Sequence, residues 1–169
     1  IACDIRLNDA LEHNLVVPFH YFGISDIKSI DYENIDLSKI DELAKLLNVN
    51  KRAEFIIEQM NFYSHIGNKR KVIGFCVSKE HASFMSEKFN ENKINSISLT
   101  SVDSIEKREE YIKKLEDEND SLEVIFTVDI FNEGVDIPSI NTVLFLRPTN
   151  SPIVFIQQLG RGLRKHKNK

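Results

Sequence analysis

Short apolar runs alternate with amphipathic segments over residues 71–164, and this alternation constrains the fold more than any other feature of the sequence. The runs at 72–77, 122–128 and 142–146 have the length and composition of strands that are buried on both faces. A further short strand is expected at 95–99. Consecutive buried strands joined by helices favour a parallel sheet that is covered on both faces. The sequence therefore predicts an α/β, doubly wound fold.

Helix-capping patterns indicate where the helices between these strands begin. Ser78 directly follows the first apolar run and is expected to cap a helix. Asp103, followed three residues later by Glu106, has the spacing of a capping box and is expected to start another helix. Ser151 and Pro152 have the cap and first-turn residue types of a last helix. Each of these helices would connect or flank strands of the sheet.

The apolar positions within the predicted helices recur at helical spacing, which indicates the faces that are buried. Two helices are also expected before the first strand, the second of them over residues 51–66. We therefore divide the chain into a lead-in and helical segment, residues 1–70, and the main α/β domain, residues 71–169. The residues of the main domain's helices expected to face the core are Ala82, Met85, Phe89, Ile105, Ile112 and Leu115.

Composition excludes several classes of protein. The net charge of -4 argues against a broad basic surface for nucleic acid. No apolar run approaches the length of a membrane span, so the protein is expected to be soluble and cytoplasmic. Cys3 and Cys76 are isolated and the five histidines are scattered, so no metal site is predicted. Because the sequence starts at Ile1 and ends in a basic tail, both ends are expected to be internal points of a longer protein.

The last predicted helix contains the pattern Q-x-x-G-R-x-x-R, formed by Gln157, Gly160, Arg161 and Arg164. Two arginines three residues apart share one helix face, and arginine suits bidentate contacts with phosphate. A solvated basic helix end, which the helix dipole favours, is the alternative explanation. Gly160 and Gly162 each cost a helix about 1 kcal/mol relative to alanine, which indicates the close approach of a ligand or partner.

A second polar segment, residues 127–138, directly follows a predicted buried strand. It combines a hydroxyl group, several carboxylates and a glycine where doubly wound sheets bind ligands. A polar loop with a glycine turn and a proline stop would give a similar composition. The occurrence of both polar segments, in this order, favours the functional interpretation.

These segments resemble motifs of the superfamily-two helicases. Residues 74–78 are similar to motif IV, residues 127–138 to motif V and residues 157–164 to motif VI, and the resemblance covers residues 71–165. Residues 17–21 and 131–138 are further similar to a bacterial subgroup of DNA-type helicases. The resemblance implies that the fold is a RecA-like helicase C-terminal domain, the second motor domain of an ATP-dependent enzyme.

For the nucleotide, the resemblance implies roles at five positions. Arg164 would be the arginine finger that reaches the γ-phosphate of ATP bound on another domain, with Arg161 beside it. Gln157 would help to hold the nucleotide, and Gly134 and Asp136 would approach its ribose.

For nucleic acid, the resemblance implies that Ser78 and Thr127 contact the backbone of one strand. Gln157 and Gln158 stand where the RNA-acting DEAD-box group has His-Arg. DNA is therefore the expected substrate, and RNA is disfavoured.

The sequence lacks the parts that bind and activate ATP. It contains no G-x-x-x-x-G-K-[ST] loop, and neither Asp41-Glu42 nor Asp117-Glu118 follows a predicted buried strand, as a magnesium-binding pair should. ATP and Mg²⁺ are therefore expected to be bound mainly by an N-terminal motor domain of the same protein, and this fragment alone is expected to be inactive. Two alternatives stay open: the motor of a restriction system that translocates duplex DNA, and a non-catalytic nucleotide- or partner-binding module.

Overall fold

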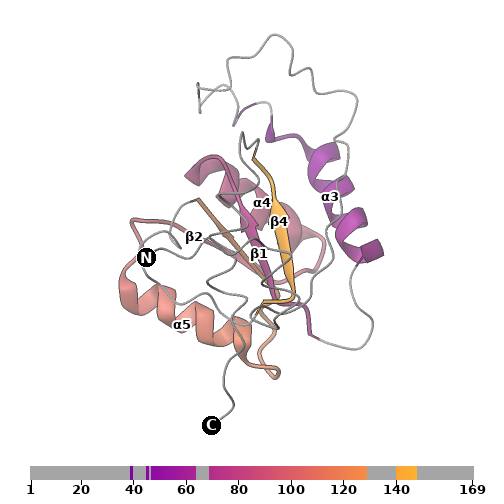
Figure 1. Cartoon of the computed structure of the whole chain (residues 1–169). Helices are drawn as coiled ribbons and strands as arrows, with labels where there is room; N and C mark the ends of the chain where they lie inside the picture. The colour runs from indigo at the N-terminus through magenta and orange to yellow at the C-terminus, as the bar shows by residue number, and fades with distance from the viewer. Residues whose placement is uncertain (1–38, 40–44, 46, 64–68, 129–139, 148–169) are drawn as a thin grey trace, which may run out of the picture.

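The computed structural model describes residues 39, 45, 47–63, 69–128 and 140–147. In these ranges it contains a sheet of parallel strands in the order β2-β3-β1-β4 (Figure 1). The strands are β1 (Val72–Phe75), β2 (Ser96–Leu99), β3 (Val124–Thr127) and β4 (Thr142–Phe145). The described helices are α3 (Asn50–Tyr63), α4 (Lys79–Glu91) and α5 (Ile105–Glu116). The predicted α/β fold with a parallel sheet is confirmed.

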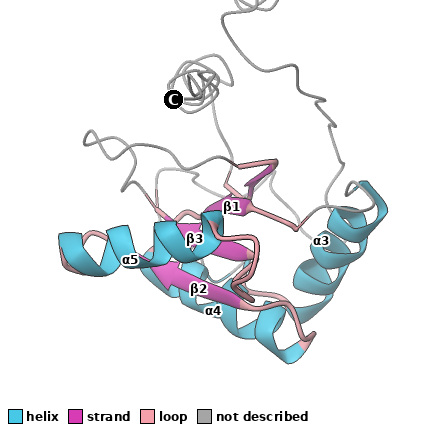
Figure 2. Ribbon diagram, turned by 90° about the horizontal axis from the view of Figure 1, so that it is seen from below, coloured by secondary structure: helices cyan, strands magenta, loops and turns pink. Residues whose placement is uncertain are grey.

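Helices cover the sheet on both faces, because successive residues of a strand point to opposite sides. On one face Val72, Val124 and Phe126 pack in a cluster with apolar side chains of α3 and α4. On the other face Ile73 and Ile125 pack in a second cluster with Leu115 of α5, among others. Figure 2 shows the strands between α5 and α4. The sheet is therefore the middle layer of the described fold.

The predicted core faces of α4 and α5 are confirmed with one exception. The predicted residues of α4 are fully buried, and Ile112 and Leu115 of α5 are buried as well. Ile105, the first residue of α5, is 66% exposed, so its predicted core position is wrong. The residue one turn further along this face is Arg108, which is buried instead. The buried face of α5 therefore begins at a charged residue, Arg108, and continues with Ile112 and Leu115.

The start of α5 also differs from the prediction. Ser104, not Asp103, is the N-cap, and its Oγ accepts a hydrogen bond from the Lys107 N–H at 3.2 Å. The Asp103 carboxylate accepts instead from the Thr100 N–H at 2.8 Å and from Lys107 Nζ at 2.6 Å. Asp103 thereby closes the turn before the helix, and the serine that follows it is left to cap the helix.

The fourth strand is half-buried rather than fully buried along its whole length. In the described sheet β4 pairs with β1 on one side and lies at the edge of the strand order, which leaves its other side without a described strand.

Helix α3 contributes to the same core as the sheet. Ala53, Ile57 and Met60 are buried in the cluster that contains β1 and α4. The boundary predicted at residue 71 stays a prediction, although this packing joins α3 closely to the α/β domain. The helix expected after Ser151 lies outside the described residues, and so does most of the one expected before residue 50.

Candidate nucleic-acid interface at the carboxyl edge of the sheet

All four strands end at one edge of the sheet, because they are parallel. In doubly wound sheets ligands bind at this carboxyl edge. At this edge β1 leads to Ser78, β3 ends at Thr127, and β2 is followed by the loop of residues 100–104. The two nucleic-acid contacts expected from the sequence and described by the structure are Ser78, which follows β1, and Thr127, which ends the neighbouring strand β3; both lie at this edge.

Ser78 caps α4 as predicted. Its backbone is extended (φ -145°, ψ 170°), and its Oγ accepts a hydrogen bond from the His81 N–H at 3.1 Å. The first N–H groups of a helix favour anions. The charged carboxylate of Glu80 opposes an anion here: a hydrogen bond from its own backbone N–H, and a weaker one from Ser78, lower its pKa. This helix end therefore suits a single phosphate contact rather than a deep anion site.

Buried groups behind Ser78 hold the turn in place and carry no reactive chemistry. The Val77 N–H donates to His81 Nδ1 at 3.4 Å. Burial, assisted by the positive charge of Arg52, lowers the pKa of His81 to about 4, so the imidazole is neutral. Burial raises the pKa of Cys76 to about 12, although Arg52 and Arg147 act in the opposite direction. A neutral imidazole and a protonated thiol support the turn but supply neither a base nor a nucleophile at neutral pH.

Thr127 is the last residue of β3 and lies between Phe75 and Leu99 in the strand register. Its carbonyl oxygen accepts a hydrogen bond from the Cys76 N–H at 2.7 Å, which ties the ends of β1 and β3 together. The side chain is fully buried, and Oγ1 has no hydrogen-bond partner within the described part of the chain. A buried hydroxyl without a partner is uncommon and costs stability, which is typical of positions kept for function.

Arg108 is a candidate contact at this edge that the sequence did not single out. Its guanidinium donates through Nη2 to the Ser101 carbonyl oxygen at 2.8 Å, and the side chain is buried. Its Nε has no hydrogen-bond partner among the residues that the structure describes. One signal was present: Arg108, Ile112 and Leu115 have the i, i+4, i+7 spacing of one helix face.

The loop before α5 and the first residue of α5 present apolar side chains at the same edge. Val102 is 75% exposed and Ile105 66% exposed, while the Asp103 carboxylate holds the loop to Thr100. The turn is therefore well ordered by hydrogen bonds although its apolar side chains face solvent.

The remaining predicted site residues lie outside the described residues, so the structure does not place them. They are Gly134, Asp136, Gln157, Arg161 and Arg164. Within the described residues, no three His, Cys, Asp or Glu side chains are grouped so that they could hold a metal ion. No helix of this part of the chain is long and apolar enough to cross a membrane.

A parallel α/β sheet covered by helices on both faces defines a fold class whose members bind ligands at the carboxyl edge of the sheet. Residues 39–166 match the family model of the helicase conserved C-terminal domain. The chain belongs to this family, and the resemblance inferred from the three motifs is confirmed.

Two curated relatives and one solved structure show the range of similar proteins. IRC3 of Saccharomyces cerevisiae, a candidate ATP-dependent helicase, is 32% identical over 146 residues, which are 86% of this chain and 20% of the relative. The candidate helicase 22 of a Sulfolobus islandicus filamentous virus is 32% identical over 123 residues, 72% of this chain and 20% of the relative. The chain thus spans about a fifth of the length of these relatives.

The solved structure is a fragment of a candidate HsdR subunit of a type I restriction enzyme from Vibrio vulnificus. It superposes with a TM-score of 0.55 at 22% identity and covers 79% of this chain and 26% of that one. At this identity the likeness supports the fold.

Proposed function

We propose that the chain is the C-terminal motor domain of an ATP-dependent DNA helicase or translocase, which acts together with an ATP-binding domain of the same protein. One observation carries this proposal: the family match extends over residues 39–166 and so includes the described carboxyl edge and both arginines of the last polar segment. A binding module without catalysis would have no need to retain this pair of arginines.

On the nucleotide side, Arg164 is the proposed arginine finger, and Arg161 lies three residues before it. Gln157 helps to hold the nucleotide, and Gly134 and Asp136 approach the ribose. An arginine finger stabilises charge on the phosphoryl group as it transfers, which typically raises turnover by about 10³–10⁵. The planar guanidinium can contact two phosphate oxygens at once, which an ammonium group cannot.

On the nucleic-acid side, Ser78 and Thr127 contact the backbone of one strand, and Arg108, which donates to the loop after β2, adds positive charge at this edge. Support comes from their common edge, from the position of Ser78 at the N-terminus of α4 and from the Thr127 hydroxyl, which has no hydrogen-bond partner among the described residues. Because Thr127 is fully buried, its contact requires that the hydroxyl become accessible when DNA and the other motor domain bind. So few contacts give weak, salt-dependent binding by this domain alone.

Mg²⁺ does not fit the acidic residues of the described part. Asp117 is the C-cap of α5 and accepts from the Asn119 N–H at 2.9 Å, and Glu118 forms an ion pair with Lys71. Lys71 precedes β1, so this acidic pair lies at the amino edge, opposite to the proposed ligand edge. ATP and its metal are therefore assigned to the other motor domain.

A second candidate function is duplex translocation without strand separation. The sequence similarity to a type I restriction enzyme, the EcoKI endonuclease subunit of Escherichia coli, favours it: the two chains are 28% identical over 118 residues, 63% of this chain and 10% of the relative. Both functions use the same motor and the same arginines. They differ in what happens to the DNA strands as the protein moves.

The test uses the full-length protein, because this domain alone is expected to hydrolyse no ATP. Steady-state ATP hydrolysis is measured without nucleic acid and with single-stranded DNA, duplex DNA or RNA. Stimulation by DNA but not by RNA supports the proposal, and stimulation by RNA alone would contradict the assignment of DNA. A strand-displacement assay and a triplex-displacement assay then separate the two functions. A helicase displaces a strand of the duplex, whereas a duplex translocase displaces only the third strand of the triplex.

A further inference from the structure

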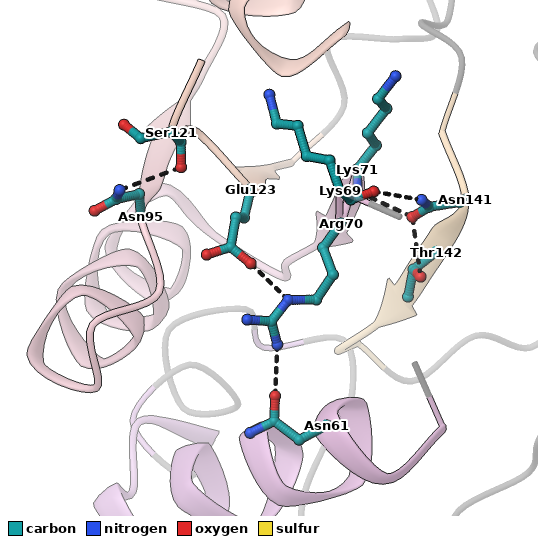
Figure 3. Close-up of polar contacts among 9 residues, drawn as sticks. All are labelled: Asn61, Lys69, Arg70, Lys71, Asn95, Ser121, Glu123, Asn141 and Thr142. Carbon is teal, nitrogen blue, oxygen red and sulfur yellow. Dashed lines mark hydrogen bonds and ion pairs between the residues drawn. The ribbon is translucent and has the colours of Figure 1, made fainter. Parts of the chain in front are cut away.

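Strand β2 lies at the edge of the described sheet, where it pairs with β3 on one side. At its start the Asn95 carbonyl oxygen accepts from main-chain N–H groups at the start of β3, and the Asn95 side chain donates to the Ser121 carbonyl oxygen at 3.2 Å (Figure 3). The main-chain groups of successive strand residues point to opposite sides, so every second residue after Asn95 also faces β3. The residues between them, Ser96 and Ser98, direct their main-chain N–H and carbonyl groups away from β3.

The side chain of Asn90, near the end of α4, occupies this outer side of β2 at Ser96. Its Oδ1 accepts a hydrogen bond from the Ser96 N–H at 2.9 Å, and its Nδ2 donates to the Ser96 carbonyl oxygen at 3.0 Å. The Ser96 hydroxyl also donates to the Ser86 carbonyl oxygen of α4 at 2.8 Å. The amide group of Asn90 therefore makes the pair of bonds that one residue of an added antiparallel strand would make.

Asn141 makes the same kind of bond in a different setting. Its Oδ1 accepts from the Lys71 N–H at 2.9 Å, and its Nδ2 donates to the Lys69 carbonyl oxygen at 2.8 Å (Figure 3). These bonds extend the ladder between β1 and β4, which are paired strands. Asn90 instead covers a side of β2 that has no strand beside it in the described part of the chain. Its amide therefore stands where a further strand could bind.

An edge strand with unpaired main-chain groups is a template for strand addition by another chain. For β2 a self-complementary partner exists, because a two-fold axis can pair the strand with β2 of a second copy. In one antiparallel register, Ser96 of each copy faces Ser98 of the other, and the residues of each such pair exchange both main-chain bonds. Each pair needs one Ser96, so Asn90 blocks both pairs.

Carboxylates on α4 oppose the same contact. Glu87 and Glu91 are exposed, and they line a hollow that Asn90 and Ser98 also line. A two-fold axis beside β2 would bring the glutamates of both copies toward each other, and like charges repel. Charged side chains along an edge strand are a common protection against strand addition.

We propose that Asn90 protects the edge of β2: its amide occupies the main chain of Ser96 and thereby prevents a second copy of this chain from adding its own β2 there. The inference goes beyond the proposed function and does not depend on it. It concerns how the chain avoids pairing with itself, not how it acts on ATP or DNA.

Asn92 offers a matched control on the same helix. It is the C-cap of α4, and its Nδ2 donates to the Lys88 carbonyl oxygen at 2.9 Å. Asn92→Ala therefore also removes an exposed asparagine side chain that bonds to the main chain, but it leaves the bonds to Ser96 in place.

The experiment measures self-association of the full-length protein and its variants by sedimentation velocity over a range of concentrations, at physiological and at high salt. Asn90→Ala is expected to raise the association constant at least about tenfold, because it frees main-chain groups for several intermolecular hydrogen bonds. High salt should strengthen this association, since it screens the glutamates. Asn92→Ala should associate like wild type. Adding Ser98→Pro to Asn90→Ala removes an outward N–H group and should return association to the wild-type level.

An Asn90→Ala protein that associates no more than wild type at either salt concentration overturns the inference. Equal association of Asn92→Ala, or unchanged association after Ser98→Pro is added, overturns it as well, because the contact would then not use β2. Melting curves on the same preparations check that the variants fold. An Asn90→Ala protein that no longer folds would show that Asn90 supports the structure instead.

Discussion

Replacing Thr127 by valine tests the proposed nucleic-acid edge through a single hydroxyl group. Thr127 is fully buried at the end of β3, and its Oγ1 has no hydrogen-bond partner within the described part of the chain. An unpaired buried polar group costs about 1–3 kcal/mol. Valine keeps the branched shape and replaces the hydroxyl by a methyl group. We expect Thr127→Val to raise the free energy of unfolding by about 1 kcal/mol, or Tm by about 2–4 °C.

The same substitution should weaken the motor, because it removes the proposed contact with a strand phosphate. Denaturant unfolding and melting curves measure stability, and DNA affinity of the full-length protein measures function. We expect DNA affinity to fall at least about tenfold, as for one lost hydrogen bond to a charged group, which contributes about 1.5–3 kcal/mol. Thr127→Ser is the control: it keeps the hydroxyl and loses a methyl group, so it should lower stability by about 1 kcal/mol and retain DNA affinity.

Thr127→Val is thus expected to gain stability and lose DNA affinity, whereas Thr127→Ser is expected to lose stability and keep DNA affinity. A Thr127→Val protein that is less stable than wild type by more than about 1 kcal/mol would show that the hydroxyl is paired in the folded state, contrary to the reasoning. A more stable Thr127→Val protein with unchanged DNA affinity would remove Thr127 from the proposed interface.

Three further predictions concern the support of this edge. A methyl group at Gly74 would overlap the buried ring of Phe126, so Gly74→Ala should lower the free energy of unfolding by about 1–3 kcal/mol. Denaturant titration measures this change. An unchanged unfolding midpoint would contradict the close contact between Gly74 and Phe126. Burial lowers the pKa of His81 to about 4 from 6.5. The unfolded chain therefore binds more protons between these values, and stability should fall by about 2 kcal/mol from pH 7 to pH 5. In the His81→Asn variant the asparagine Oδ1 can still accept from the Val77 N–H, and the loss of stability between pH 7 and pH 5 should be smaller. An equally large loss of stability in the variant would show that other groups cause it. Because burial raises the pKa of Cys76 to about 12, iodoacetamide at pH 8 should modify this thiol only in denaturant, as peptide mass spectrometry can show; rapid modification of the folded chain would contradict its burial.

The parts of the fold that depend on local sequence were predictable. The apolar runs that became strands and the serine cap of α4 follow from neighbouring residues, and their positions agree with the structure to within a few residues. Asp103 and Ser104 show the limit of local patterns, because both can cap a helix. Only the competing hydrogen bonds from Thr100 and Lys107 to Asp103 decide which one does.

Features that depend on distant parts of the chain were not predictable. Arg52 is buried because α3 lies beside the end of β4, where its Nη2 donates to the Leu146 carbonyl oxygen at 3.5 Å. Nothing near Arg52 in the sequence indicates a partner 94 positions away. Asn141 was missed for the same reason, since its two side-chain bonds reach residues about 70 positions earlier. The burial of Thr127 likewise depends on its place in the sheet.

The most direct test of the proposed motor is DNA-stimulated ATP hydrolysis by the full-length protein with Arg164 replaced. Lys113, an exposed residue of α5, offers a control, since Lys113→Ala also removes one positive charge. We expect Arg164→Ala to lower turnover at least about a hundredfold, Arg164→Lys to recover little of it, and Lys113→Ala to have no effect. Melting curves on the same preparations should match wild type. An Arg164→Ala protein that hydrolyses ATP at nearly the wild-type rate contradicts the arginine-finger assignment, and one that no longer folds shows that Arg164 supports the structure instead.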